Sequence, residues 1–163
     1  HIGYNYRITE FQSAVAMAQV DRIDELVGWR KKSGKAITDL LKSADIFITQ
    51  NTPDYIEHSY WCVGARLQTD LDTWYKFRDY LFKVCGERIF GAWQVPYKEP
   101  VMRNDNFKRY LHSDYNQISY EEGLCPNAEL IQKEMMVFKT KYRNDESLNN
   151  FIKGLEKTII EFK

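Results

Sequence analysis

The sequence predicts a small β-sheet with helices packed on it, of α/β or α+β type. The first indication is the alternation of segments with helical periodicity and short strand-like segments, without an internal repeat or a low-complexity tract. The second is size and composition: 163 residues, of which 44% are hydrophobic and 28% are charged. This is an ordinary globular mixture, and the length suits one compact domain or two small layers around one core.

The segment from Thr9 to Leu41 is predicted to be one long helix. Thr9 and Gln12 have the spacing of a capping box, and Gly28 is expected to mark a bend. An apolar stripe follows at helical spacing. It consists of Phe11, Ala14, Val15, Ala18, Ile23, Leu26, Val27, Ile37, Leu40 and Leu41.

The middle of the chain alternates between strand and helix. Ile46–Ile48 is expected to be a short strand, and Ser59–Leu67 reads as a second strand because it is aromatic-rich and partly alternating. Asp70–Cys85 has apolar residues three or four apart, which predicts an amphipathic helix. Ile89–Val95 is again strand-like, and Pro96 ends it.

The last third of the chain is predicted to hold two helices. Met102–Glu122 is expected to be a loop with one helical turn, and Pro126–Met136 a helix with proline in its first turn. Val137–Tyr142 is a short extended stretch before a helix over Asp145–Phe162. The buried stripe of that helix is predicted to be Leu148, Phe151, Ile152, Leu155, Ile159 and Ile160. The core is predicted to contain Trp61, Val63, Phe77, Leu81, Phe151, Leu155 and Ile159.

Charge and cysteine content exclude several classes of function. Lys+Arg and Asp+Glu balance at 23 each, so nothing favours binding to nucleic acid or to an anionic membrane. No apolar run approaches the roughly 20 residues of a membrane span. Three cysteines without a CxxC pair fit reduced thiols in a cytoplasmic protein. The histidines are far apart, and the phosphate-loop, dinucleotide and zinc-protease motifs are absent.

Three blocks of sequence are more specific. Residues 3–25 begin Gly-Tyr-Asn-Tyr-Arg-Ile-Thr-Glu and continue into an alanine-containing helix. The second block is His58-Ser59-Tyr60-Trp61, and the third is Cys125-Pro126-Asn127-Ala128-Glu129. In this order they closely resemble the DegT/StrS-type sugar aminotransferases. The resemblance covers nearly the whole chain and is weakest from Val101 to Glu122.

The resemblance implies the C-terminal portion of a fold type I enzyme that depends on pyridoxal 5'-phosphate (PLP). Such an enzyme transfers an amino group from glutamate to a nucleotide-linked keto-deoxy sugar, for a surface polysaccharide or a glycosylated metabolite. It acts as a homodimer with active sites at the subunit interface. Residues 1–42 would be an interdomain segment with a long helix, and residues 43–163 the small C-terminal domain.

The resemblance also assigns the candidate site residues. Asn5 is expected to contact the cofactor phosphate of the neighbouring subunit, and Arg7 to lie at the same site, where an amide and a guanidinium suit a phosphate. His58 is a candidate substrate contact. The alternatives are that Asn5 shapes a turn, that Arg7 pairs with Glu10, and that His58 is structural.

The chain departs from the family pattern in two respects. Aligned on Pro96, Gln94 and Lys98 replace the Tyr and His of a common Tyr-x-Pro-x-His motif. The family's catalytic lysine motif, Ser-x-His-x-x-Lys, is missing, so no catalytic residue is expected in this chain, and a start at His1 suggests a piece of a larger protein. The alternatives are a PLP-dependent sugar dehydratase, which has histidine for that lysine, and a non-catalytic oligomerisation module.

Overall fold

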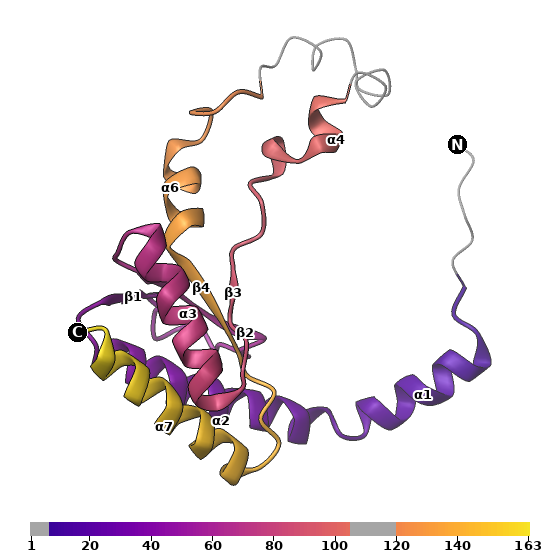
Figure 1. Ribbon diagram of the computed structural model, residues 1–163. Coiled ribbons are helices and arrows are strands. Elements are labelled where there is room, and N and C mark those ends of the chain that lie inside the picture. Colours follow the sequence, from indigo (N-terminus) through magenta and orange to yellow (C-terminus); the bar gives the residue numbers. More distant parts are fainter. Residues whose placement is uncertain (1–6, 105–119) are drawn as a thin grey trace.

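Four short strands form one antiparallel sheet in the computed structural model, which describes residues 7–104 and 120–163 (Figure 1). The helical elements are α1 Glu10–Val20, α2 Ile23–Lys42, α3 Leu71–Cys85, the 3-10 helix η1 Pro96–Lys98, α4 Pro100–Arg103, α6 Pro126–Glu134 and α7 Asp145–Glu161. The strands are β1 Phe47–Thr49, β2 Cys62–Leu67, β3 Phe90–Gly91 and β4 Met135–Lys139. Their order in the sheet is β1-β2-β4-β3.

One face of the sheet is buried and the other is partly open. β2 pairs with β4 so that Val63 lies opposite Phe138 and Ala65 opposite Met136, and all four side chains are buried. The residues between them on both strands are only half-buried. This alternation is typical of an antiparallel sheet packed on one side.

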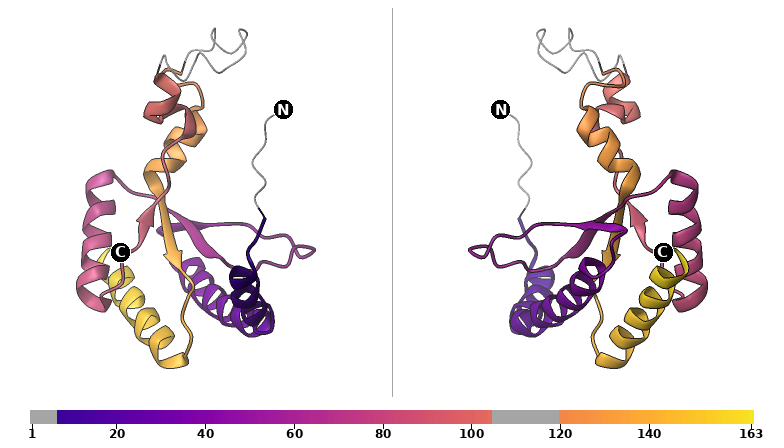
Figure 2. Two further views of the ribbon diagram at one scale, coloured as in Figure 1. Left: turned by 90° about the vertical axis from the view of Figure 1, so that its right-hand side faces the viewer. Right: turned by 90° about the vertical axis from the view of Figure 1, so that its left-hand side faces the viewer.

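Helices α2, α3 and α7 pack on the buried face of the sheet (Figure 2). Ile37 of α2, Phe77 of α3 and Leu155 of α7 have no exposed surface, and the Phe77 ring meets Phe47 edge-on at 5.6 Å. This confirms the predicted core residues other than Trp61. Truncating a fully buried leucine such as Leu155 to alanine costs about 2–5 kcal/mol.

Trp61 from the predicted core and Ile160 from the predicted buried stripe of the last helix are exposed instead. Trp61 is 68% exposed because β2 begins only at Cys62, and the turn before it directs the indole outward. Ile160 is 69% exposed because it follows Ile159 on α7 and is therefore rotated by about 100° away from the buried side of the helix.

The predicted long helix from Thr9 to Leu41 is two helices, and the break lies at Asp21–Arg22, not at Gly28. The amide of Arg22 donates to the carbonyl of Gln19, so the last turn of α1 is tightened. The backbone of Arg22 then leaves the helical region, with a ψ angle of 11°. Gly28 lies within α2 without interrupting it. Helical periodicity alone does not locate such a break.

Strand boundaries also differ from those predicted. The strand expected over Ser59–Leu67 is shortened at its start, and only Phe90–Gly91 of Ile89–Val95 pairs with a neighbour. The helix expected over Pro126–Met136 ends at Glu134, because Met135 and Met136 join β4. The ends of these elements depend on pairing with strands that are distant in the sequence, and the residues of one segment do not reveal that pairing.

Two parts of the molecule extend away from the packed body (Figure 1). Helix α1 leaves on one side and precedes α2. On another side η1 and α4 lie near α6. We call residues 94–104 and 120–134, which contain these three elements, the arm; it extends above the sheet. The predicted loop over Met102–Glu122 falls mostly outside the described residues.

Candidate functional site

The predicted cofactor residues lie at the start of the chain. Asn5 lies outside the described residues. Arg7 is exposed and comes just before the capping box, in which Thr9 Oγ1 accepts from the amide of Gln12 and the Thr9 amide donates to Gln12 Oε1. The capping box therefore fixes where the helix begins, and Arg7 lies two residues before the N-cap residue Thr9.

Helix α1 has no buried residue, although much of its surface is apolar. Phe11 is 80% exposed and Met17 68%, and Val15 and Val20 are also exposed. Its apolar residues are distributed around the helix and do not form one stripe. A helix that is apolar on several sides is normally buried on several sides.

His58 belongs to a tight turn that leads into β2. Its Nδ1 accepts a hydrogen bond of 2.8 Å from the amide of Tyr60, and the two rings are stacked with centroids 4.3 Å apart. Because Nδ1 is an acceptor, a neutral His58 carries its proton on Nε2. The pocket that His58 lines has a volume of about 20 Å³, which is room for a water molecule and not for a sugar.

Tyr60 holds the left-handed backbone conformation at φ 53°, which is uncommon for a residue with a side chain. Its ring packs directly on Gly34 of α2, where an added Cβ would lie 2.2 Å from the ring. Its carbonyl lies 2.5 Å from the hydroxyl of Thr140. Contacts from α2 and from the residue after β4 thus hold this turn in place.

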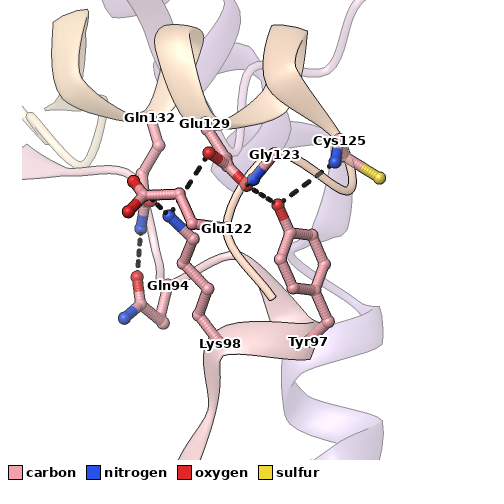
Figure 3. A network of polar contacts seen from close by, with 8 residues as sticks. All are labelled: Gln94, Tyr97, Lys98, Glu122, Gly123, Cys125, Glu129 and Gln132. Carbon is pink, nitrogen blue, oxygen red and sulfur yellow. Dashed lines mark hydrogen bonds and ion pairs between the residues drawn. The ribbon is translucent and has the colours of Figure 1, made fainter. Parts of the chain in front are cut away.

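The arm contains the clearest polar cluster among the described residues (Figure 3). The Glu129 carboxylate is 8% exposed and accepts from the Tyr97 hydroxyl and, at 2.8 Å, from the amide of Gly123. The Tyr97 oxygen in turn accepts from the amide of Cys125 at 3.3 Å. Gly123 takes a φ of 93°, which favours glycine and brings its amide to Glu129.

Lys98 lies between two carboxylates in the same cluster. Its Nζ is 3.2 Å from Glu122 and 3.5 Å from Glu129. Burial lowers the pKa of the Lys98 ammonium, but the hydrogen bond and charge of Glu122, with Glu129, outweigh burial and raise it. The pKa of Glu129 is lowered by the Tyr97 hydrogen bond, then by the Gly123 amide, with Lys98 adding to the effect.

This cluster ties η1 to the start of α6 and was not predicted from sequence. Residues 96–98 and 125–129 are far apart in the chain, and nothing in a single sequence pairs them. Gln94 is held as well, since its Oε1 accepts from Gln132 Nε2 at 2.8 Å. The two residues that depart from the family motif, Gln94 and Lys98, are thus both engaged within the arm.

Lys98 does not have the surroundings of a lysine that binds PLP covalently. A lysine that binds PLP covalently needs an amine that loses its proton readily, which burial without carboxylate partners provides. Lys98, with a side chain 15% exposed, has the opposite setting, because two carboxylates stabilise its ammonium.

The described part of the chain lacks two further features. Residues 7–104 and 120–163 contain no cluster of three or more His, Cys, Asp or Glu side chains placed to bind a metal ion. Within the same residues, no helix combines the length and apolarity that crossing a membrane requires.

Comparison with solved structures shows the fold of part of an aminotransferase. 3-Amino-5-hydroxybenzoic acid (AHBA) synthase matches with a TM-score of 0.72 and 18% identity, over 99% of this chain and 41% of that one. Helicobacter pylori PseC, an aminotransferase involved in the biosynthesis of pseudoaminic acid, matches with a TM-score of 0.72 and 17% identity, over 99% and 40%. The chain therefore spans about two fifths of the length of these proteins.

Sequence comparison identifies the family. The model of the DegT/DnrJ/EryC1/StrS aminotransferase family matches residues 1–147, and the chain belongs to this family. A GDP-perosamine synthase from Caulobacter vibrioides is 28% identical in an alignment of 79 residues that covers 44% of this chain and 20% of that protein. These findings confirm the resemblance and the fold class predicted from the sequence.

Proposed function

We propose that this chain is the C-terminal part of a PLP-dependent enzyme that transfers an amino group from glutamate to a nucleotide-linked keto-deoxy sugar. The observation that carries the proposal is the family match over residues 1–147. The similarity to a GDP-perosamine synthase supports a nucleotide-sugar substrate. The complete enzyme is proposed to be a cytoplasmic homodimer that supplies amino sugars for polysaccharides or glycosylated metabolites.

The catalytic lysine is proposed to lie on polypeptide outside this chain. In this arrangement residues 1–42 connect a large PLP-binding domain to the small domain formed by residues 43–163. The exposed apolar surface of α1 supports the proposal, because such a helix requires a partner that the described residues do not provide. PLP would supply the electron sink for amino transfer.

Asn5 and Arg7 are proposed to hold the cofactor phosphate of the neighbouring subunit. Asn5→Ala should weaken PLP retention, because a hydrogen bond to a charged group contributes roughly 1.5–3 kcal/mol. Mixed dimers of the complete enzyme test the geometry, with Asn5→Ala on one subunit and the catalytic lysine removed from the other. If Asn5 acts across the interface, both defects fall in one site and about half the activity remains. Loss of both sites would place Asn5 in its own subunit's site.

The coding sequence upstream of the codon for His1 separates the alternatives. A lysine within a Ser-x-His-x-x-Lys setting supports amino transfer. A histidine at that position supports the PLP-dependent sugar dehydratase. A start codon immediately before His1 supports a non-catalytic oligomerisation module and contradicts the proposal.

A further inference from the structure

Two tryptophan side chains lie together on the surface between the body and the arm. Trp61 precedes β2 and Trp93 follows β3, and their ring centroids are 6.4 Å apart with planes inclined at 58°. Trp61 is 68% exposed and Trp93 is 84% exposed. Two large aromatic side chains are thus exposed to solvent at one place, although a buried tryptophan would contribute a large apolar area to a core.

The backbone beneath both indoles is held by side chains of α2, of α6 and of the residue after β4. The Trp61 carbonyl accepts from Arg30 Nη1 of α2 at 3.0 Å and lies 3.0 Å from the Thr140 hydroxyl. The Trp93 carbonyl accepts from Gln132 Nε2 of α6 at 2.9 Å. An aromatic group on a fixed backbone loses little conformational freedom when it binds a ligand.

The turn before Trp61 also carries a local conformational cost. Tyr60 takes a φ of 53°, and strain of this kind persists only where the surroundings enforce it. The packing of its ring on Gly34 and its contact with Thr140 do so here. Together they keep Trp61 turned away from the core, although the next residue but one, Val63, is buried in it.

We propose that Trp61 and Trp93 form an aromatic platform that binds the base of the nucleotide-sugar substrate, an inference that rests on the proposed function for its substrate class. Every nucleobase has a flat π-face that stacks on an indole. The two rings contact each other with centroids 6.4 Å apart and planes inclined at 58°, so a base stacks on the outer face of one ring and does not enter between them. The exposed residues of α1 are mainly aliphatic with alanines between, which suits protein packing and not a base.

The test is an NMR titration of the full chain, observing the indole Nε1–H signals of its four tryptophans. The probes are GMP and UMP, and ribose 5-phosphate serves as a ligand without a base. Trp61→Phe and Trp93→Phe assign the signals, and Trp29→Phe is the matched control. Trp74, which is buried, reports whether each variant remains folded.

We expect saturable shifts of the Trp61 and Trp93 signals with nucleotides, and none with ribose 5-phosphate. Trp93→Ala should weaken binding at least about fivefold, whereas Trp29→Phe should leave it unchanged. Equal shifts with ribose 5-phosphate, or no shift at millimolar nucleotide with Trp74 in its native position, would overturn the inference. Neither result bears on the upstream lysine, so the proposed function is tested separately.

Discussion

Two glycines of α2 differ in what surrounds them. A Cβ at Gly34 would lie 2.2 Å from the Tyr60 ring, whereas a Cβ at Gly28 would meet nothing within 4 Å. Alanine normally stabilises a helix interior by about 0.5–1 kcal/mol relative to glycine. We expect Gly28→Ala to show this gain, and Gly34→Ala to destabilise by about 1–3 kcal/mol through overpacking. Urea unfolding of both variants measures the difference, and equal effects would contradict the close contact.

Two substitutions of His58 can separate the roles of its two ring nitrogens. Asparagine can place an acceptor oxygen where Nδ1 meets the Tyr60 amide, whereas glutamine reaches the position of Nε2. We expect His58→Asn to retain native stability and His58→Gln to lose about 1 kcal/mol, because the Tyr60 amide loses its acceptor. Chemical denaturation decides the structural role. If the complete enzyme instead keeps its activity with glutamine and loses it with asparagine, His58 contacts substrate through Nε2.

The charge of Glu129 makes the stability of the arm depend on pH. Its pKa is lowered in the folded chain, chiefly by the Tyr97 hydrogen bond, so its contribution is present above the ordinary pKa of 4.5 and is lost as pH falls through the folded value. Glu129→Gln should therefore lower the urea midpoint at pH 7. The gap from the native chain should close below about pH 4.5. A constant gap from pH 7 to pH 3 would show that the charge is not responsible.

At the scale of elements, α1 and α2 should differ in protection. Residues 10–20 of α1 bury no side chain, while Ser33, Ile37 and Leu41 of α2 are buried against the body. We expect hydrogen exchange of the purified chain to be fast throughout α1 and slow in the second half of α2. Slow exchange in α1 of a monomeric sample would reveal a partner within this chain and would require the fragment proposal to be revised.

The elements that could be predicted from the sequence are those whose own residues carry the apolar spacing and the capping residues of that element. The apolar spacing of α3 and α7 indicates which side of each helix is buried, and Asp70 and Asn144 cap them locally. β3 has two residues and exists through its pairing with β4, so no local pattern defines it. Tyr97 and Glu129 meet only after the arm has formed, and Trp61 faces outward because of the Tyr60 backbone.

At the scale of the whole molecule, the chain alone should form no stoichiometric covalent adduct with PLP. We expect this because the family's lysine motif is missing from the sequence and because Lys98 is paired with two carboxylates. The measurement is incubation with PLP, borohydride reduction and mass spectrometry of the peptides. We expect scattered, substoichiometric labelling of exposed lysines. One lysine labelled completely, with the label lost on its mutation to alanine, would refute the prediction.

The strand order has a consequence for synthesis on the ribosome. β4 lies between β2 and β3 in the sheet, yet it is the last strand in the chain, after α3, the arm and α6. Until β4 emerges, β2 has a free edge toward the centre of the sheet, and β3 has no strand to pair with. Free strand edges in a nascent chain invite association with other chains. The sheet therefore closes late in translation, and the arm must be made before the strand that anchors it.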